Sequence, residues 1–449
     1  MKLHKTAARR KSSSNRTLDW LRKFESRNVT YTARDGSWPI VWERARGCHV
    51  WDANGKRYLD LTAAFGVAAA GHANPAVVRA GWRQMRQLLH AMGDVHPHQQ
   101  KAALARELSG LTFERWTGKA RASQRLRGKT IFCSSGFEAV EAALKTARLA
   151  TNRAGVIAFE GAYHGLGYGA LNVTHRPHFR QPFRNQLREF ASFLPFPDDE
   201  QGVETAERRI LALMRGGKMG AVLVEPVQGR GGIRVPPPSF LPMLRRLCHK
   251  HDLLLVVDEI YTGFGRTGRW FACEHTGVVP DLICVGKALT GGFPLSACIG
   301  RADVMDAWPV STGEAIHTST FLGHPVGCAM ALAHIAEIRR LELCQRSEQL
   351  GRLLLDSLHL VSMMWDNSSF KLKPRGLGLM VGLEVTHEDG RPATKAMLES
   401  ITNLLHRGFI FLPEGEKANV LSWTPPLIIS EHALIASLRA VVPELRSLR

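Results

Sequence analysis

Short, fully apolar runs recur through the middle of the chain and alternate with longer amphipathic stretches. An apolar run of about five residues between polar or glycine residues is typical of a strand covered on both faces. Such runs occupy residues 129–133, 155–159, 220–224, 253–257, 281–285 and 295–299. The stretches at 137–150 and 238–250 carry apolar residues at helical spacing and predict helices. The pattern predicts the α/β fold class, with a mostly parallel central sheet covered by helices.

Both ends of the chain follow a different pattern from the middle. Residues 1–16 contain six basic residues and no acid, and this composition predicts a disordered basic tail. Turn residues between two apolar stretches predict a hairpin over 47–61. We expect residues 17–74 and residues 326–449 to build one small α+β domain beside a large domain at 75–325.

Composition and charge narrow the classes of function. The chain has 449 residues, of which 45% are hydrophobic and 22% charged, and this balance is typical of a globular protein. The formal net charge is +19, but outside the tail the basic residues are scattered and do not alternate with aromatic rings that could stack on bases. No apolar run reaches the length of about eighteen residues that a transmembrane helix needs. We therefore expect neither a nucleic-acid nor a membrane partner.

The eight cysteines include no C-x-x-C pair. Several of them lie in apolar, strand-like runs, as Cys284 does, and such positions are typical of small buried hydrophobes. This usage indicates a reducing, cytoplasmic compartment and predicts no metal site.

Polar and aromatic side chains follow five of the predicted strands. Because ligands bind at the carboxyl ends of the strands in open α/β sheets, we expect these side chains to meet at one site. They are Ser135, Gly136 and Phe137 after the first strand, Tyr163 and His164 after the second, Glu225 and Gln228 after the third, Asp258 after the fourth, and Lys287 after the fifth. Each of them taken alone also has an ordinary structural explanation, such as helix capping by a serine.

The five strand ends together match the needs of pyridoxal phosphate. The helix that starts after Ser135 can bind a phosphate group through its free backbone N–H groups. Tyr163 can stack on a planar ring, and Asp258 can keep a pyridinium nitrogen protonated. Lys287, beside a buried sheet end, can lose solvation and act as nucleophile and base.

The order and spacing of six motifs resemble those of class III aminotransferases, which belong to the fold-type-I pyridoxal-phosphate-dependent family. This family includes enzymes for 4-aminobutyrate, acetylornithine and omega-amino acids, and the resemblance runs from about residue 38 to the C-terminus. The matching segments are 134–145, 161–165, 224–229, 258–268, 286–292 and 317–325.

The resemblance implies a role for each matching residue. Lys287 would hold pyridoxal phosphate as a Schiff base and then move the proton. Asp258 would pair with the pyridinium nitrogen, and Tyr163 would stack on the ring. The phosphate contacts would come from Ser135, Gly136 and Phe137.

Further positions of the family pattern lie around the cofactor. The residues expected beside the cofactor and the substrate are His164, Glu225, Gln228 and Tyr261. Thr320 would bind the phosphate of the partner subunit, so the resemblance implies a homodimer.

Departures from the family pattern concern the substrate. In relatives that act on 4-aminobutyrate or ornithine, an arginine near the late Pro-Leu segment binds the keto acid carboxylate, and here that position is Ser422. The 4-aminobutyrate enzymes carry a further arginine where this chain has Leu166, and Tyr261 stands where the family often has glutamine. Arg230 is our candidate for the missing carboxylate anchor. Phe65 occupies a position that lines the pocket in relatives and is expected to favour an apolar substrate body.

The sequence therefore predicts an aminotransferase that moves an amino group from a primary amine or omega-amino acid to a 2-keto acid by a ping-pong mechanism. A racemase, an aminomutase or a decarboxylase on the same scaffold is an alternative, because the motifs do not exclude one. A non-catalytic binding protein of the same fold is a further alternative, against which the intact Lys287 and Asp258 argue.

Overall fold

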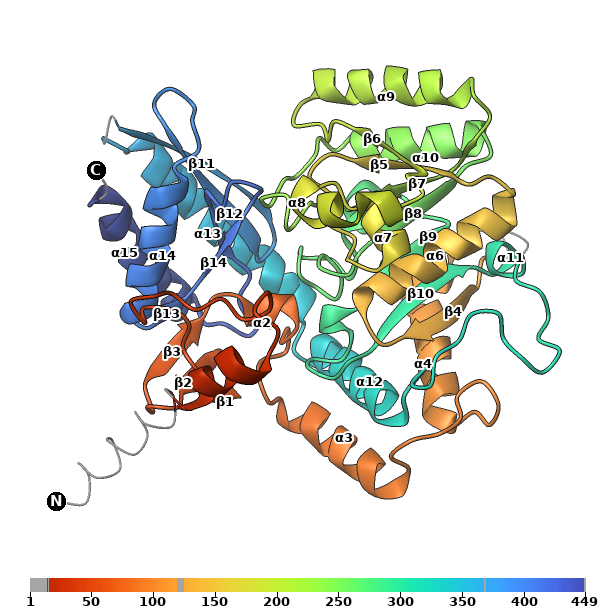
Figure 1. The fold of residues 1–449 in the computed structure, drawn as a ribbon, viewed down its shortest axis with the longest axis horizontal. Helices are drawn as coiled ribbons and strands as arrows, with labels where there is room; N and C mark the ends of the chain where they lie inside the picture. The colour runs from red at the N-terminus through yellow and green to blue at the C-terminus, as the bar shows by residue number, and fades with distance from the viewer. Residues whose placement is uncertain (1–13, 15, 119–124, 367–368, 448–449) are drawn as a thin grey trace.

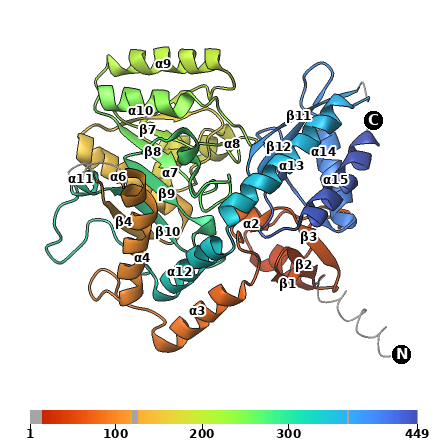
Figure 2. The ribbon, with the colours of Figure 1, turned by 180° about the vertical axis from the view of Figure 1, so that it is seen from behind.

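The computed structural model describes residues 14, 16–118, 125–366 and 369–447. The predicted basic tail therefore lies outside the described residues except at positions 14 and 16. Figures 1 and 2 show a larger body around a central sheet, and beside it a smaller body to which both ends of the chain contribute.

The larger body is built on a seven-stranded sheet with the strand order β4-β10-β9-β8-β7-β5-β6. The strands in this order are Gly128–Cys133, Ser296–Arg301, Leu282–Val285, Leu254–Asp258, Met219–Val224, Gly155–Phe159 and Ala191–Leu194. Neighbouring strands from β9 to β6 are parallel, which confirms the prediction of a mostly parallel sheet. The apolar pattern did not reveal β6, a short strand at the edge of the sheet.

Strand β10 differs from the others because it is antiparallel to both of its neighbours, β4 and β9. Only residues 286–295 join β9 to β10. A parallel return needs a connection of about a dozen residues or more, usually a helix, and this link is too short for one. The chain therefore turns back beside β9, and Lys287 lies in the turn.

Side chains in the sheet alternate between two apolar cores. In β5, Ile157 and Phe159 belong to one core, while Val156 and Ala158 belong to the other. The helices that cover these faces include α9 (Glu200–Met214) and α10 (Phe240–Lys250) on the first, and α6 (Gly136–Thr151) and α7 (Tyr168–Val173) on the second. Because both faces are covered, the strands are apolar along their whole length, as the sequence pattern indicated.

The smaller body contains two four-stranded sheets. The first has the order β1-β2-β3-β13, with strands Trp42–Arg46, His49–Asp52, Arg57–Asp60 and Phe409–Ile410. The second has the order β11-β12-β15-β14, with strands Phe370–Leu377, Met380–His387, Val420–Trp423 and Leu412–Glu414. Strands β2 and β3 form the predicted hairpin, and β3 pairs with β13, so the two ends of the chain share one sheet.

Long helices complete the C-terminal part. Helix α12 (Pro325–Arg340) packs against α3 (Pro75–Gln87) and α4 (Gln99–Ser109), which places it with the larger body. Helices α13 (Leu343–Met363), α14 (Thr394–His406) and α15 (Glu431–Arg446) belong to the smaller body. None of the described helices combines the length and the apolar character that crossing a bilayer requires.

A candidate cofactor and substrate site at the strand ends

A hollow of about 440 Å³ lies at the carboxyl ends of the central strands. Ten of the residues that the sequence analysis selected line it, namely Gly136, Phe137, Tyr163, His164, Leu166, Glu225, Arg230, Asp258, Tyr261 and Lys287. They come from the ends of β4, β5, β7, β8 and β9, so the fold brings together residues that are far apart in the sequence. This is the place where open α/β sheets bind their ligands.

Lys287 follows β9 and adopts a left-handed backbone conformation, with φ at 36°. A non-glycine residue in this region is strained, and such strain is held in place by the surrounding structure. Its Nζ lies 4.5 Å from the centre of the Tyr261 ring. Burial lowers the pKa of the Lys287 amine, although the nearby charges of Asp258 and Glu225 oppose this effect. The amine is therefore held where its neutral, nucleophilic form is favoured.

Asp258 is the last residue of β8, one position beyond the predicted strand, and both of its carboxylate oxygens accept hydrogen bonds. Oδ2 accepts from Nδ1 of His164 at 2.7 Å, and Oδ1 accepts from the backbone N–H of Ile260 at 3.0 Å. Burial lowers the pKa of His164, but the hydrogen bond and the charge of Asp258 outweigh burial and raise the pKa overall. The carboxylate of Asp258 is thus fixed in orientation at the floor of the hollow.

Glu225 is a second buried acid in the hollow. Its Oε2 accepts a hydrogen bond from the backbone N–H of Tyr163 at 3.1 Å. Burial raises the pKa of Glu225 to about 7, against the charge of His164, which lowers the pKa. Its carboxyl group therefore changes charge near neutral pH.

The start of α6 provides a group of hydrogen-bond donors. Glu138 accepts from the backbone N–H groups of Ser134 and Ser135, each at 2.8 Å, and thereby fixes the turn before the helix. The hydroxyl of Ser135 is buried and has no hydrogen-bond partner among the described residues. The first N–H groups of a helix have no acceptor within it, and Gly136 and Phe137 line the hollow at this point. These donors, together with the helix dipole, suit a phosphate group.

Tyr261 occupies a slot between two glycines. A Cβ atom on Gly66 would lie 2.6 Å from the ring of Tyr261, and one on Gly229 would lie 2.3 Å from it. The Tyr261 hydroxyl lies 3.2 Å from Oγ1 of Thr424, next to β15 of the smaller body. The ring thus fills the position where the family often has glutamine, and its hydroxyl is used by the protein itself.

Arg230 enters the hollow from the loop after β7 and forms an ion pair that the sequence analysis did not anticipate. Its Nη1 lies 3.1 Å from Oε2 of Glu414, a fully buried side chain on β14. Burial raises the pKa of Glu414 to about 7, although the charges of Arg230 and Arg176 lower it. The only signal for Glu414 in the sequence was its position as the single acid at the end of an apolar stretch, 409–414. Arg176 had no signal in the sequence.

Several selected residues lie elsewhere. Ser422 is buried in β15, where its hydroxyl donates to the carbonyl of Leu412 at 3.1 Å, so it does not reach the hollow. Gln228 donates through Nε2 to the carbonyl of Glu160 at 2.9 Å, while its buried Oε1 has no partner among the described residues. Phe65 is exposed on a left-handed turn, and Thr320 is exposed on the segment before α12.

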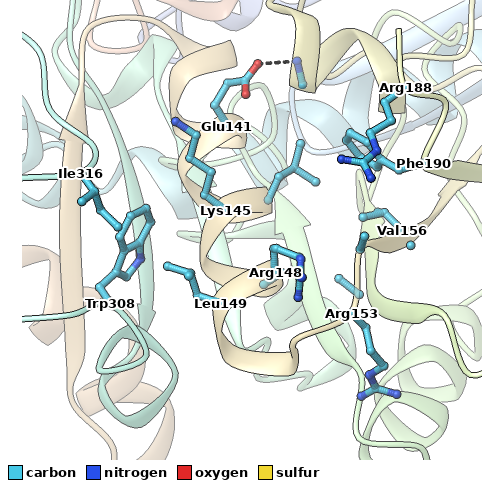
Figure 3. Close-up of a pocket in the computed structure, with 16 residues that line it drawn as sticks. Glu141, Lys145, Arg148, Leu149, Arg153, Val156, Arg188, Phe190, Trp308 and Ile316 are labelled. Atoms are coloured by element: carbon cyan, nitrogen blue, oxygen red, sulfur yellow. Dashed lines mark hydrogen bonds between the residues drawn. The ribbon is translucent and has the colours of Figure 1, made fainter.

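A second hollow, of about 430 Å³, lies at the opposite end of the sheet (Figure 3). Lys145, Arg148 and Leu149 of α6 line one side of it, and Trp308 and Ile316 line another. It includes the beginning of β5 rather than its end, and it shares no residue with the first hollow. No group of three or more metal-ligating side chains occurs among the residues that the structure describes.

Comparisons with known proteins agree with this site. A family model described as aminotransferase class-III matches residues 30–442. The acetylornithine aminotransferase of Methanopyrus kandleri is 36% identical over 409 residues, covering 91% of this chain and 95% of that protein. The 4-aminobutyrate aminotransferase GabT of Escherichia coli is 33% identical over 416 residues, covering 90% of this chain and 92% of that protein.

Among solved structures, an amine transaminase from an uncultivated Pseudomonas species, in its PLP-bound form, superposes with a TM-score of 0.81. It is 28% identical, and the match covers 95% of this chain and 98% of that one. The fold and the enzyme class that the motifs predicted are thus confirmed, and the chain belongs to the class III aminotransferase family.

Proposed function

We propose that this chain uses pyridoxal phosphate to move an amino group from a primary amine or omega-amino acid to a 2-keto acid. The observation that carries the proposal is the buried amine of Lys287, which shares one hollow with Asp258 and the start of α6. Relatives named acetylornithine and 4-aminobutyrate aminotransferase support it. When bound, pyridoxal phosphate supplies an aldehyde that takes up the amino group and a ring that accepts electrons.

The residues of the hollow fit this cofactor. The unpartnered hydroxyl of Ser135 and the first N–H groups of α6, at Gly136 and Phe137, would hold the phosphate. Asp258 would hold the proton on the ring nitrogen, and its bond to His164 keeps the carboxylate in one orientation. Tyr163 would stack on the ring. Glu225 and Tyr261 would complete the surroundings of the cofactor and the substrate. Gln228, which donates to the carbonyl of Glu160, does not line the hollow.

Lys287 would move the proton at the reacting carbon of the substrate. Burial lowers the pKa of Lys287, so its amine gives up a proton more readily than a solvated lysine does, which suits a general base. The ring of Tyr261, 4.5 Å from Nζ, limits the positions that the amine can take. Burial in the hollow removes solvation from the amine, and this favours its neutral form over the ammonium form.

Arg230 would bind the carboxylate of the substrate. It is the arginine that lines the hollow, and it stands in place of the two arginines that relatives carry at positions 166 and 422. Its partner Glu414 is buried, so Arg230 is oriented without being fully neutralised near pH 7. Leu166 at the mouth, and Phe65 on the neighbouring turn, would leave room for an apolar substrate body.

A homodimer is part of the proposal, and an exposed apolar face supports it. One side of α3 and of the residues after it carries four exposed apolar side chains. They are Val78, Trp82, Met85 and Leu89, with exposed fractions of 50%, 54%, 46% and 59%. Apolar surface of this kind marks interaction sites. The face is continuous with the segment that carries Thr320, because the ring of Phe321 lies 5.3 Å from that of His90. Pairing through this face would bring Thr320 to the partner subunit's phosphate. The eight unpaired cysteines fit a cytoplasmic location.

The function is tested on the full chain loaded with pyridoxal phosphate. We expect a near-visible absorption band that borohydride bleaches. The reduced cofactor should then be attached covalently to the peptide that contains Lys287. A panel of amines and amino acids should donate to pyruvate or 2-oxoglutarate. Lys287→Ala should lose both properties, while Lys250→Ala, at an exposed helix end, should keep them. Racemisation, isomerisation or carbon dioxide release without amino transfer would contradict the proposal and support one of the alternative enzymes on this scaffold.

A further inference from the structure

Arg176 is a buried cation beside the hollow that has no acidic partner. It lies between α7 and α8 (Pro177–Arg180), and only 9% of its surface is exposed. Within the described part of the chain it forms no ion pair with a carboxylate, and its Nε is buried without a hydrogen-bond partner. Among the described residues, the one hydrogen bond of its guanidinium group runs from Nη2 to the backbone carbonyl of Arg230. A buried guanidinium without a counter-ion is costly and is therefore expected to have a function.

The acids around Arg176 are already engaged or exposed. Glu414 pairs with Arg230 at 3.1 Å, and Glu225 accepts from the backbone of Tyr163. Glu416 is exposed and lies 3.9 Å from the amine of Lys417. Burial lowers the pKa of Arg176, the charge of Arg230 lowers it further, and these three acids only partly oppose the shift. Among the described residues, none of these three acids forms an ion pair with Arg176.

Arg176 and Arg230 also act together on the hollow. Burial raises the pKa of Tyr163, and the charges of Arg230 and then Arg176 oppose this shift. Tyr163 and Arg230 both line the hollow. Arg230 uses Nη1 for Glu414 and keeps the rest of its guanidinium group available, with 32% of the side chain exposed.

We propose that Arg176 is the second cation of a subsite which it forms with Arg230, and that this subsite takes the carboxylate group of the substrate. The inference rests on the proposed function, since it assigns the anionic end of that substrate. Two guanidinium groups from separate loops can surround one carboxylate, and charge-assisted bonds of this kind are the strong ones. An incoming carboxylate would supply the counter-ion that the folded chain does not provide to Arg176.

Binding of a non-reactive carboxylate to the holoenzyme is the direct test. We expect Arg176→Gln to weaken the binding of glutarate, measured by calorimetry, by about 10-fold or more, as the loss of a charged hydrogen bond implies. Arg176→Lys, which keeps the charge, should retain part of the affinity. Arg184→Gln is the matched control. Arg184 is exposed on the short helix that follows α8 and pairs with Glu189, so this variant should bind glutarate as the wild type does. Unchanged glutarate binding in Arg176→Gln would overturn the inference.

A second measurement separates binding from a structural role. Arg176 could instead only clamp the loop of Arg230 through the bond to its carbonyl. In that case Arg176→Gln and Arg176→Met would slow amino transfer from 1-phenylethylamine, which has no carboxylate, as much as from an omega-amino acid, and the inference would be wrong. We expect the rate of the first half-reaction with 1-phenylethylamine, measured without a keto acid, to stay within about two-fold, since no charged bond is lost in it. If the wild type transfers no amino group but glutarate binding still depends on Arg176, the proposed function fails and the anion subsite stands.

Discussion

Nδ1 of His164 donates a hydrogen bond of 2.7 Å to Oδ2 of Asp258, and solvent reaches neither side chain to any extent. The bond joins the loop after β5 to the end of β8 across the intervening strand β7. It leaves Nε2 of His164 buried without a partner among the described residues. Under the proposed function His164 is a positioning residue, since it would act on the cofactor through Asp258.

Replacing His164 should weaken cofactor binding. His164→Phe removes the donor and leaves Asp258 buried with one hydrogen bond fewer, so the apparent Kd for pyridoxal phosphate should rise about 10-fold or more. Fluorescence or absorbance titration of the apoenzyme measures this constant. His178→Phe, on the neighbouring helix α8, is the matched control. Equal cofactor affinity in His164→Phe and the wild type would show that Asp258 keeps its orientation unaided.

Glu225 should make the apoprotein less stable as the pH rises. Its carboxyl group keeps the proton to a pH of about 7 in the folded chain and loses it near 4.5 when unfolded. The folded state thus binds more protons between these values, and the free energy of unfolding falls as pH increases, by at most about 3 kcal/mol from this group. Glu225→Gln keeps an acceptor for the Tyr163 N–H and should flatten the dependence in urea unfolding from pH 5 to 8. A variant with the same slope as the wild type would argue against this assignment.

Substitutions of the two members of the ion pair, Arg230 and Glu414, should change the affinity for keto acids in opposite directions. Arg230→Ala removes the carboxylate anchor, and KM for the keto acid should rise about 10-fold or more while kcat changes less. Glu414→Gln removes the competing carboxylate, so KM should fall at pH 8, where Glu414 with its pKa of about 7 is ionised, and change little at pH 6. Steady-state kinetics at both pH values provide the check. An unchanged KM in Arg230→Ala would exclude Arg230 as the anchor.

The slot around Tyr261 predicts a steric conflict that a second substitution relieves. Gly229→Ala places a Cβ 2.3 Å from the Tyr261 ring, and this overpacking should cost about 1–3 kcal/mol of stability. In Gly229→Ala/Tyr261→Gln the smaller side chain should restore most of that loss. Thermal or urea unfolding of the two single variants and the double variant gives the coupling energy. Additive effects would mean that the ring and Gly229 do not constrain each other.

The apolar face of α3 should be the subunit interface. Trp82→Glu places a charge in the centre of this face, so the protein should become monomeric. Each site would then lack the Thr320 that the other subunit supplies, and its affinity for the cofactor should fall. Sedimentation velocity and cofactor titration measure the two effects. Leu360→Glu, on α13, changes an equally exposed residue outside the face and should leave the dimer intact. A wild type that is monomeric at micromolar concentration would remove the interface from the proposal.

Glu225, Asp258 and Lys287 could be found from the sequence because each follows an apolar run within two residues. Leu166, Arg230 and Tyr261 were selected from the family pattern instead. In a mostly parallel sheet covered on both faces, the runs mark the strands and the strands end at one edge, so Lys287 and Asp258 had to meet. Position in the chain was sufficient here, since the local pattern determines where each strand stops. The same reasoning placed the start of α6 at Gly136.

Other features depended on contacts between distant segments. The slot for Tyr261 needs Gly66 and Gly229 on either side of one ring. Ser422 stands where relatives have an arginine, yet its register in β15 buries it against Leu412 and keeps it from the hollow.

The sequence by itself determined six of the seven strands of the large sheet and the chemical groups at their ends, because apolar periodicity and turn residues act locally. Only the tertiary structure decided which charges face one another. Glu414 reaches Arg230 across 184 residues of chain, and Arg176 lies against the backbone of that same loop. Burial raises the pKa of Glu414 and lowers the pKa of Arg176. That burial depends on how the two bodies pack together, which no single segment of the sequence determines.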